Sequence, residues 1–205
     1  MKDSYKLLNE IHSLPLVSEL SKLSIREVLL EAIKSTQSFG LDKNIEIKYR
    51  KPRTDECVLG DHGQLLQVAK NLITNAIRFG SKGDQVFIEQ DTIQGKRYND
   101  ISDFVRIGVR ICGLGISKEM FDIVIEKFQN LTELLRVKPR ETSGLELSYS
   151  QQVIKNLGGN IWIKSRLGKG LTFYFTIPLA SKARNRCESK SIREVDIKSP
   201  LPLNV

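Results

Sequence analysis

Two asparagines and a nearby arginine form the first group of residues that could do chemistry. Asn71 and Asn75 lie four residues apart, and Arg78 follows three residues later. On a helix, residues at these spacings share one face. Carboxamide oxygens can hold a hydrated divalent cation, because hard cations take oxygen ligands and keep several waters. The pattern is compatible with a metal-phosphate site, and also with a helix that merely has a polar edge.

Glycines mark two further candidate positions. Gly113 and Gly115 lie in a turn between a predicted strand and a predicted helix. Glycine permits positive φ there and lets a ligand approach the backbone closely. Gly144 precedes another predicted helix, whose free N–H groups and dipole can bind an anion. Each pattern alone also occurs in turns and helix starts that bind nothing.

Hydrophobic periodicity predicts the elements that would position these residues. A long amphipathic helix follows the capping residue Asp61 and ends near Gly80. Shorter helices are predicted from Ile25, where Ser24 and Glu27 form a capping box, and over 118–128 and 145–156. Alternating residues predict strands at 45–49, 57–59, 86–89, 104–109, 160–165 and 171–177, with a polar loop between the third and fourth. This mixture predicts an α+β fold, a two-layer α/β sandwich whose mixed, mostly antiparallel sheet is covered on one face by helices.

Composition indicates an ordinary soluble globular protein. The chain has 205 residues, of which 40% are hydrophobic and 27% charged. No apolar run approaches the ~20 residues of a membrane-spanning helix. The N-terminus has no apolar signal-peptide region, so we expect a cytoplasmic or organelle-stromal location. Cys57, Cys112 and Cys187 form no CxxC pair, which favours free thiols.

The net charge of +8 would suit nucleic acid, an acidic membrane surface or an acidic protein. The basic residues are spread along the chain and form no stripe interleaved with aromatic residues. Solvated surface is therefore the preferred interpretation, and nucleic acid is not an expected partner.

The order of the motifs resembles the histidine kinase/Hsp90/gyrase/MutL ATPase superfamily, and within it the sensor histidine kinases. Five segments carry the resemblance to this Bergerat-type ATP-binding fold. They are similar to the N-box helix (60–79), the first glycine box (111–116), the phenylalanine box (126–128), the second glycine box (142–147) and the closing hairpin (158–178).

This resemblance implies an ATP site with Mg²⁺. Asn75 would coordinate the metal with support from Asn71, and Arg78 and Phe79 would line the phosphate and ribose side. Residues 129–143 would form a mobile lid over the nucleotide. The implied cofactor-binding residues are Asn71, Asn75, Arg78, Phe79, Ile111, Gly113, Gly115, Lys127, Phe128, Gly144 and Leu145. Hydrolysing members carry a glutamate where this chain has Asn71, so phosphoryl transfer to histidine fits better than ATP hydrolysis.

The chain departs from the family pattern at nucleotide-contacting positions. Ile111 stands where the family has an aspartate that accepts a hydrogen bond from adenine, and its loss would cost about 1–3 kcal/mol. Thr142 and Glu146 replace two glycines of the second glycine box. No catalytic residue is identified, because neither His12 nor His62 lies in a phosphoacceptor motif.

Two main hypotheses follow. The chain is a histidine kinase-type catalytic domain that transfers phosphate from ATP to histidine, or it is a non-catalytic pseudokinase that acts as a signalling or scaffolding module. The expected partners are another histidine kinase chain or phosphoacceptor domain, a response regulator, and a second copy through the N-terminal helix. We expect a helical segment at 1–40 that resembles the end of a dimerisation region, the ATPase-like domain at 41–180, and a basic, disordered tail at 181–205.

Overall fold

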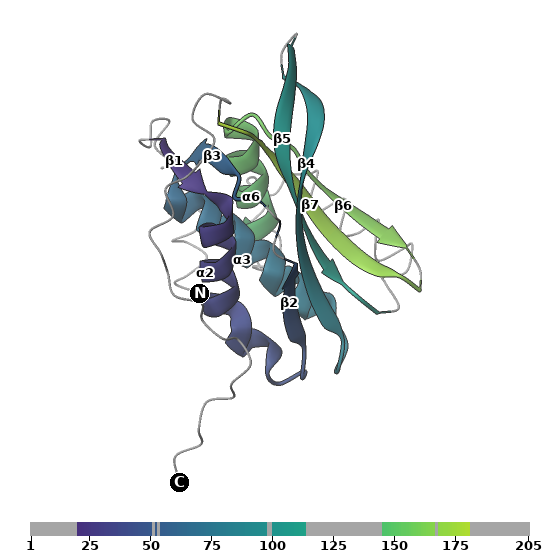
Figure 1. Ribbon diagram of the computed structural model, residues 1–205. Coiled ribbons are helices and arrows are strands. Elements are labelled where there is room, and N and C mark those ends of the chain that lie inside the picture. The colour runs from purple at the N-terminus through teal and green to yellow at the C-terminus, as the bar shows by residue number, and fades with distance from the viewer. Residues whose placement is uncertain are drawn as a thin grey trace.

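The chain folds into two layers, with helices against one face of a twisted sheet (Figure 1). A computed structural model describes residues 20–50, 52, 54–97, 100–113, 145–166 and 168–180. The sheet has five strands in the order β2-β4-β5-β7-β6, with β2 parallel to β4 and the other pairs antiparallel. The strands are β2 (Glu46–Arg50), β4 (Gln85–Arg97), β5 (Asp100–Ile111), β6 (Ile161–Arg166) and β7 (Gly170–Pro178). The predicted α+β sandwich with a mixed, mostly antiparallel sheet is confirmed.

Side-chain caps define where the helices begin. The Ser24 side chain accepts a hydrogen bond from the Glu27 N–H and starts α2 (Ile25–Thr36), which continues into the 3₁₀ turn η1 (Gln37–Gly40). The Asp61 carboxylate accepts a 2.8 Å bond from the Gln64 N–H and starts α3 (His62–Phe79). The third helix is α6 (Leu145–Asn156). None of the helices in the described ranges is both long and apolar enough to cross a membrane.

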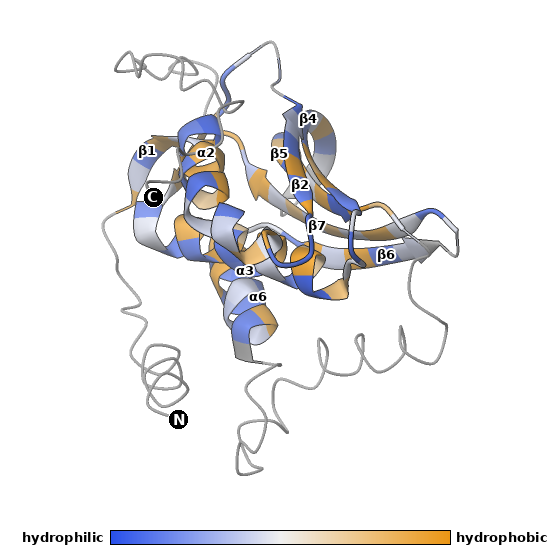
Figure 2. Cartoon of the chain, turned by 90° about the horizontal axis from the view of Figure 1, so that it is seen from below, coloured by the Kyte–Doolittle hydropathy of each residue, from blue (hydrophilic) through white to orange (hydrophobic). Residues whose placement is uncertain are grey.

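The core lies between the helices and the sheet. Apolar residues recur on one side of α2 and α3 and alternate along the strands (Figure 2). Helix α3 contributes the largest share of the helical side, through side chains that are almost fully buried. These are Leu65, Val68, Ala69, Leu72, Ile73, Ala76 and Ile77. The opposing sheet residues include Val86, Ile88, Val105, Ile107, Phe173 and Phe175. Residues of α2 join the same core, although the division of the chain into domains stays a prediction.

Three features differ from the sequence prediction. The segment between 89 and 104 is not a polar loop, because β4 and β5 pair continuously to Arg97 and Asp100 in a long hairpin. A short strand, β1 (Ser21–Ser24), pairs with β3 (Cys57–Gly60) in a second small sheet. In both cases the backbone N–H and C=O groups pair with the partner strand whatever the side chains are. Hydrophobic alternation along the sequence therefore does not reveal these strand segments. Cys57 is disulfide-bonded and only Cys112 is a free thiol within the described part, so the expectation of free thiols was wrong for Cys57.

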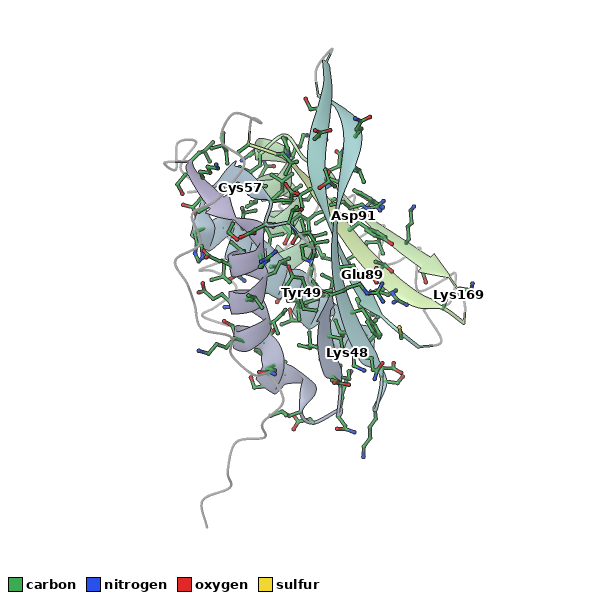
Figure 3. The ribbon with its side chains drawn as sticks, viewed as in Figure 1. Lys48, Tyr49, Cys57, Glu89, Asp91 and Lys169 are labelled. Atoms are coloured by element: carbon green, nitrogen blue, oxygen red, sulfur yellow. The ribbon has the colours of Figure 1, made fainter. Side chains whose placement is uncertain are left out.

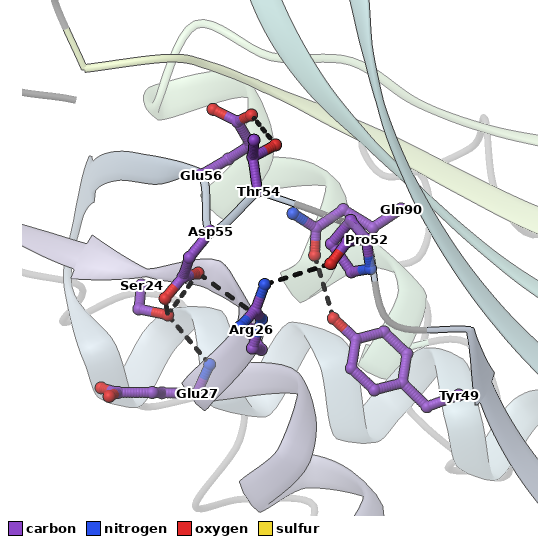
Figure 4. Close-up of polar contacts among 9 residues, drawn as sticks. All are labelled: Ser24, Arg26, Glu27, Tyr49, Pro52, Thr54, Asp55, Glu56 and Gln90. Atoms are coloured by element: carbon purple, nitrogen blue, oxygen red, sulfur yellow. Dashed lines mark hydrogen bonds and ion pairs between the residues drawn. The ribbon is translucent and has the colours of Figure 1, made fainter. Parts of the chain in front are cut away.

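A polar cluster joins α2 to the sheet at the end of β2 (Figure 4). The Ser24 hydroxyl donates to Asp55, and Arg26 donates to the Pro52 carbonyl at 3.2 Å. The Tyr49 hydroxyl donates to the Gln90 carboxamide oxygen at 3.1 Å. Burial raises the pKa of Tyr49 well above its ordinary value, so this phenol stays a neutral donor.

We expect Leu72→Ala to lower the free energy of unfolding by about 2–5 kcal/mol, because Leu72 is 0% exposed at the centre of α3. The matched substitution Leu41→Ala, at a side chain that is 74% exposed, should change it by less than about 0.5 kcal/mol. Urea denaturation of both variants measures the difference. Equal effects at the two positions would show that α3 does not form the core as described.

Candidate functional site

Asn75 is the residue whose geometry best suits a metal ligand. It lies on α3 and is 1% exposed. Its side-chain nitrogen donates to the Asn71 carbonyl at 2.7 Å, and its side-chain oxygen accepts a hydrogen bond from the Arg78 guanidinium. The inward bond fixes which way the amide points, so the oxygen faces the exposed Arg78 side chain. An oxygen held in that direction fits a Mg²⁺ ligand once the arginine moves to a phosphate.

Asn71 plays a different part from Asn75. Its amide nitrogen donates to the Glu146 carbonyl at 3.0 Å and to the Ser150 hydroxyl at 3.2 Å. Its oxygen accepts a 2.7 Å bond from the Gln67 side chain. The Asn71 side chain is therefore fully used inside the protein, where it ties α3 to α6. It supports Asn75 through its backbone carbonyl.

Arg78 and Phe79 lie at the end of α3 and differ in how far they are exposed to solvent. The Arg78 side chain is exposed, and its guanidinium carbon lies 5.8 Å from the centroid of the Phe79 ring. The Phe79 ring is half-buried and lies 6.1 Å from the ring of Phe173 on β7. Arg78 is thus exposed and could turn from Asn75 to a phosphate, whereas Phe79 mainly joins α3 to the sheet.

Ile111 belongs to the apolar core. It is 3% exposed and lies opposite Leu171, which is 1% exposed, in the pairing of β5 with β7. A Cβ at Gly80 would lie 2.8 Å from Cδ1 of Ile111 and 2.9 Å from Cδ1 of Ile45. Glycine at position 80 therefore lets the end of α3 close over these two side chains. The isoleucine side chain offers no hydrogen-bond acceptor.

Of the remaining predicted site residues, only some lie within the described part of the chain. Gly113 comes close to Asp84, since a Cβ there would lie 2.7 Å from Oδ2 of Asp84. Gly115, Lys127, Phe128, Gly144 and the predicted lid at 129–143 lie outside the described residues, as does the side chain of Leu145. The structure thus brings Asn71, Asn75, Arg78 and the backbone of Glu146 together.

Glu146 contacts this group of residues through its backbone carbonyl. Its carbonyl accepts bonds from Asn71 and, at 2.8 Å, from the Ser150 hydroxyl. The residue lies in the first turn of α6, where the helix dipole and free N–H groups favour negative charge.

Lys43 is the residue that sequence reasoning missed. Its ammonium donates to three backbone carbonyls at the C-terminal end of α3, at 3.2 Å to Ile77, 2.9 Å to Arg78 and 2.9 Å to Gly80. These carbonyls lie at the end of the helix, where the Ile77 carbonyl also accepts a 3.2 Å bond from the Gly80 N–H, and a cation there complements the helix dipole. Lys43 lies more than thirty residues before them, so no local pattern links it to α3.

His62 behaves as a surface residue. It is the first residue of α3, its side chain is 46% exposed, and its Nε2 lies 3.2 Å from a carboxylate oxygen of Glu31 on α2. His12 lies outside the described residues.

Comparison with known proteins matches residues 60–181 to the family described as histidine kinase-, DNA gyrase B-, and HSP90-like ATPase. The matched segment is more than half of the chain and contains α3, Ile111, Gly113 and α6.

Individual proteins similar to this chain include sensor kinases and a solved histidine kinase domain. The chain is 28% identical to the adaptive-response sensory kinase SasA of Prochlorococcus marinus, over 83% of this chain and 42% of that protein. It is 32% identical to the aerobic respiration control sensor protein ArcB of Escherichia coli, over 75% of this chain and 18% of that protein. The solved catalytic domain of histidine kinase ThkA superposes with a TM-score of 0.60 at 25% identity, covering 78% of this chain and 96% of that one. The chain therefore spans less than half the length of these two curated relatives.

Replacing Lys43 should loosen the end of α3. We expect Lys43→Met to lower the free energy of unfolding by about 1–3 kcal/mol, because three carbonyls lose a charged donor. Lys34→Met, at an exposed lysine in the last turn of α2, is the matched control and should cost less than about 1 kcal/mol. Chemical denaturation measures both. An effect at Lys43 no larger than at Lys34 would refute this role.

Proposed function

Because the chain belongs to the histidine kinase-, DNA gyrase B- and HSP90-like ATPase family and carries a histidine kinase-type ATP-binding domain, we propose that it binds ATP with Mg²⁺ and passes a phosphoryl group to a histidine of another segment or chain. The observation that carries this proposal is the side-chain oxygen of Asn75, which accepts a hydrogen bond from the exposed Arg78 guanidinium. A metal ligand and a phosphate-binding cation are thereby adjacent on one helix.

The roles of the residues follow from their geometry. Asn75 would hold Mg²⁺ through its side-chain oxygen, and Arg78 would turn from Asn75 to a phosphate. Bound Mg²⁺ supplies charge neutralisation on the phosphates. Lys43 keeps the carbonyl end of α3 in place behind Arg78. Since phosphoryl transfer depends mainly on positioning and charge, these residues need no acid or base of their own.

Asn71 supports transfer over hydrolysis. An amide has no basic group to activate water, and this one is engaged with Gln67, Glu146 and Ser150. Its buried bonds hold α3 against α6, the helix that follows the predicted lid.

The acceptor histidine would come from outside the described region, as the half-exposed His62 pairs with Glu31 on a neighbouring helix. A response regulator would be the next partner in such a pathway, and a second copy would join through the N-terminal segment. The proposed division places a helical linker at 1–40, the catalytic domain at 41–180 and a basic tail at 181–205.

A non-catalytic role is the second candidate, and Ile111 favours it. This side chain is 3% exposed and packs among apolar residues where the family resemblance implies a carboxylate that accepts a bond from adenine. A buried donor left unpaired costs about 1–3 kcal/mol, so nucleotide affinity would fall about 5- to 100-fold. A fold kept without tight nucleotide binding would serve as a signalling or scaffolding module.

Titration with a non-hydrolysable ATP analogue tests the first candidate. We expect Mg²⁺ to increase the analogue-induced rise in Tm, and Asn75→Ala to abolish this metal-dependent part because the ligand oxygen is lost. Asn156→Ala, at an exposed asparagine at the end of α6, is the control and should leave the response unchanged. No shift at millimolar analogue would reject the proposed ATP site and favour the non-catalytic role.

A gain-of-function variant tests the base side of the site. We expect Ile111→Asp with Glu146→Gly to raise ATP affinity by about 5- to 100-fold, because an acceptor for adenine returns and a carboxylate leaves the start of α6. Ile111→Leu with Glu146→Gly keeps the apolar contact and isolates the second change. Calorimetry of both double variants provides the comparison. An Asp variant that folds and binds no better than the Leu variant would rule out adenine contact at position 111.

A further inference from the structure

The sheet face that turns away from the helices, called the open face below, carries aromatic rings and cations. Side chains alternate across a strand, so the residues between the core positions of β4, β5, β6 and β7 gather on this side. Glu89 and Asp91 project from it, whereas Tyr49 turns toward the helices (Figure 3). No helix or strand of the described residues covers the open face. The open face is therefore a second candidate surface, on the side of the sheet opposite the helices that carry Asn75.

Three half-buried rings form two platforms on the open face. Trp162 and Tyr174 stack with centroids 5.3 Å apart and planes within 15° of parallel. Arg106 and Lys164 each lie 5.8 Å from the Tyr174 centroid. Phe87 lies on β4, which is separated from β7 by β5.

Phe87 carries a similar pair of cations. The Arg110 guanidinium lies 4.8 Å from its centroid, and the Lys48 ammonium lies 5.9 Å from it. Each platform thus combines an exposed part of an aromatic surface with two positive groups. A flat aromatic ring and a nearby anion are the two features that such a platform can bind together.

A hollow lies beside the Tyr174 ring and over Gly108. Gly108 leaves its floor without a side chain, and a Cβ there would lie 3.0 Å from Cε1 of Tyr174. The hollow has a volume of about 420 Å³ and is lined in part by Arg50, Glu89, Asp91 and Arg106. That volume falls within the range of about 300–1,000 Å³ typical of small-molecule sites. The lining offers both donors and acceptors beside an aromatic wall.

The charge of the open face is positive in balance. Arg106 pairs with Asp91, Arg50 and Arg110 lie near Glu89, and Lys48 lies near Glu46. Lys164 lies over Tyr174 and forms no ion pair with the described residues. Cations therefore outnumber carboxylates by five to three on this face, in a chain whose net charge is +8.

We propose that the open face binds single-stranded nucleic acid. Bases stack on the platforms of Tyr174 with Trp162 and of Phe87, phosphates pair with the arginines and lysines beside them, and the hollow over Gly108 accepts one nucleotide unit. Sheet platforms of aromatic rings flanked by cations suit single strands, because every base has a π-face and every linkage carries a negative charge. The basic residues are scattered in sequence, but strand alternation and register collect them beside the rings.

An acidic polypeptide fits this face less well. Carboxylates would satisfy the cations but would make no use of the rings. The stacked pair and the Gly108 hollow therefore favour a ligand with planar groups at regular intervals along an anionic chain.

Fluorescence anisotropy of the full chain with a labelled mixed-sequence single-stranded oligonucleotide tests the proposal. If about four phosphates are contacted, affinity should fall about 50-fold between 50 and 200 mM salt. We expect Tyr174→Leu with Trp162→Leu to weaken binding at least about five-fold through lost stacking. Arg106→Gln with Arg110→Gln should weaken binding and reduce the salt dependence, because two phosphate contacts are removed.

Matched controls separate the open face from the rest of the molecule. Phe39→Leu removes a ring that is 61% exposed near α2, and Lys34→Gln with Lys155→Gln removes two charges from exposed positions of α2 and α6. Both controls should bind like the unmodified chain. Thermal melts identify any variant that has lost its fold.

Three results would overturn the proposal. They are no binding at 50 mM salt, equal weakening by the open-face and control variants, and displacement by polyglutamate as effective as displacement by an unlabelled oligonucleotide. The last result would assign the open face to an acidic protein instead. None of them bears on ATP binding, so the two sites can fail separately.

Discussion

The position of α3 between the sheet and its neighbouring helices is the constraint on which the rest of the structure depends. One helical register places Leu72, Ile73 and Ala76 in the core and directs the buried amides of Asn71 and Asn75 to α6 and Arg78. A rotation of α3 about its axis would expose core residues and misdirect the amides at the same time. The free energy of burial, about 25 cal/mol per Å² of apolar surface, therefore also fixes the orientation of the candidate site residues on α3.

Local sequence signals predicted the parts of the fold that depend on near neighbours. The capping residues Ser24 and Asp61 start α2 and α3 where expected, and Gly80 ends α3. Each signal depends on a hydrogen bond within three or four residues, which the local sequence alone can reveal. Alternation likewise located the paired parts of the sheet and its mixed character. For the same reason Asn71, Asn75 and Arg78 could be placed on one helix edge from their spacing.

Long-range contacts decided what the sequence did not reveal. Nothing near Lys43 indicates that it binds the end of α3, and nothing near Asn71 indicates that its amide is used by Glu146 and Ser150 on another helix. The hairpin from Gln85 to Ile111 continues through polar residues because its backbone groups pair with each other. Pairing partners and side-chain orientation depend on the tertiary structure, which a one-dimensional pattern does not encode.

The two faces of the sheet are chemically separate although the same strands build them. On β5, Ile107 and Val109 are fully buried under the helices, while Arg106 and Arg110 alternate with them on the other side. Ile111 shows how the inner face can change: its contacts with Gly80 and the position of Leu171 favour an apolar residue, so packing is satisfied even where a polar contact to nucleotide would be lost. Substitutions on the open face encounter no such packing, since the ion pairs and rings there are partly solvated. The charge and aromatic content of that face can therefore vary without disturbing α3.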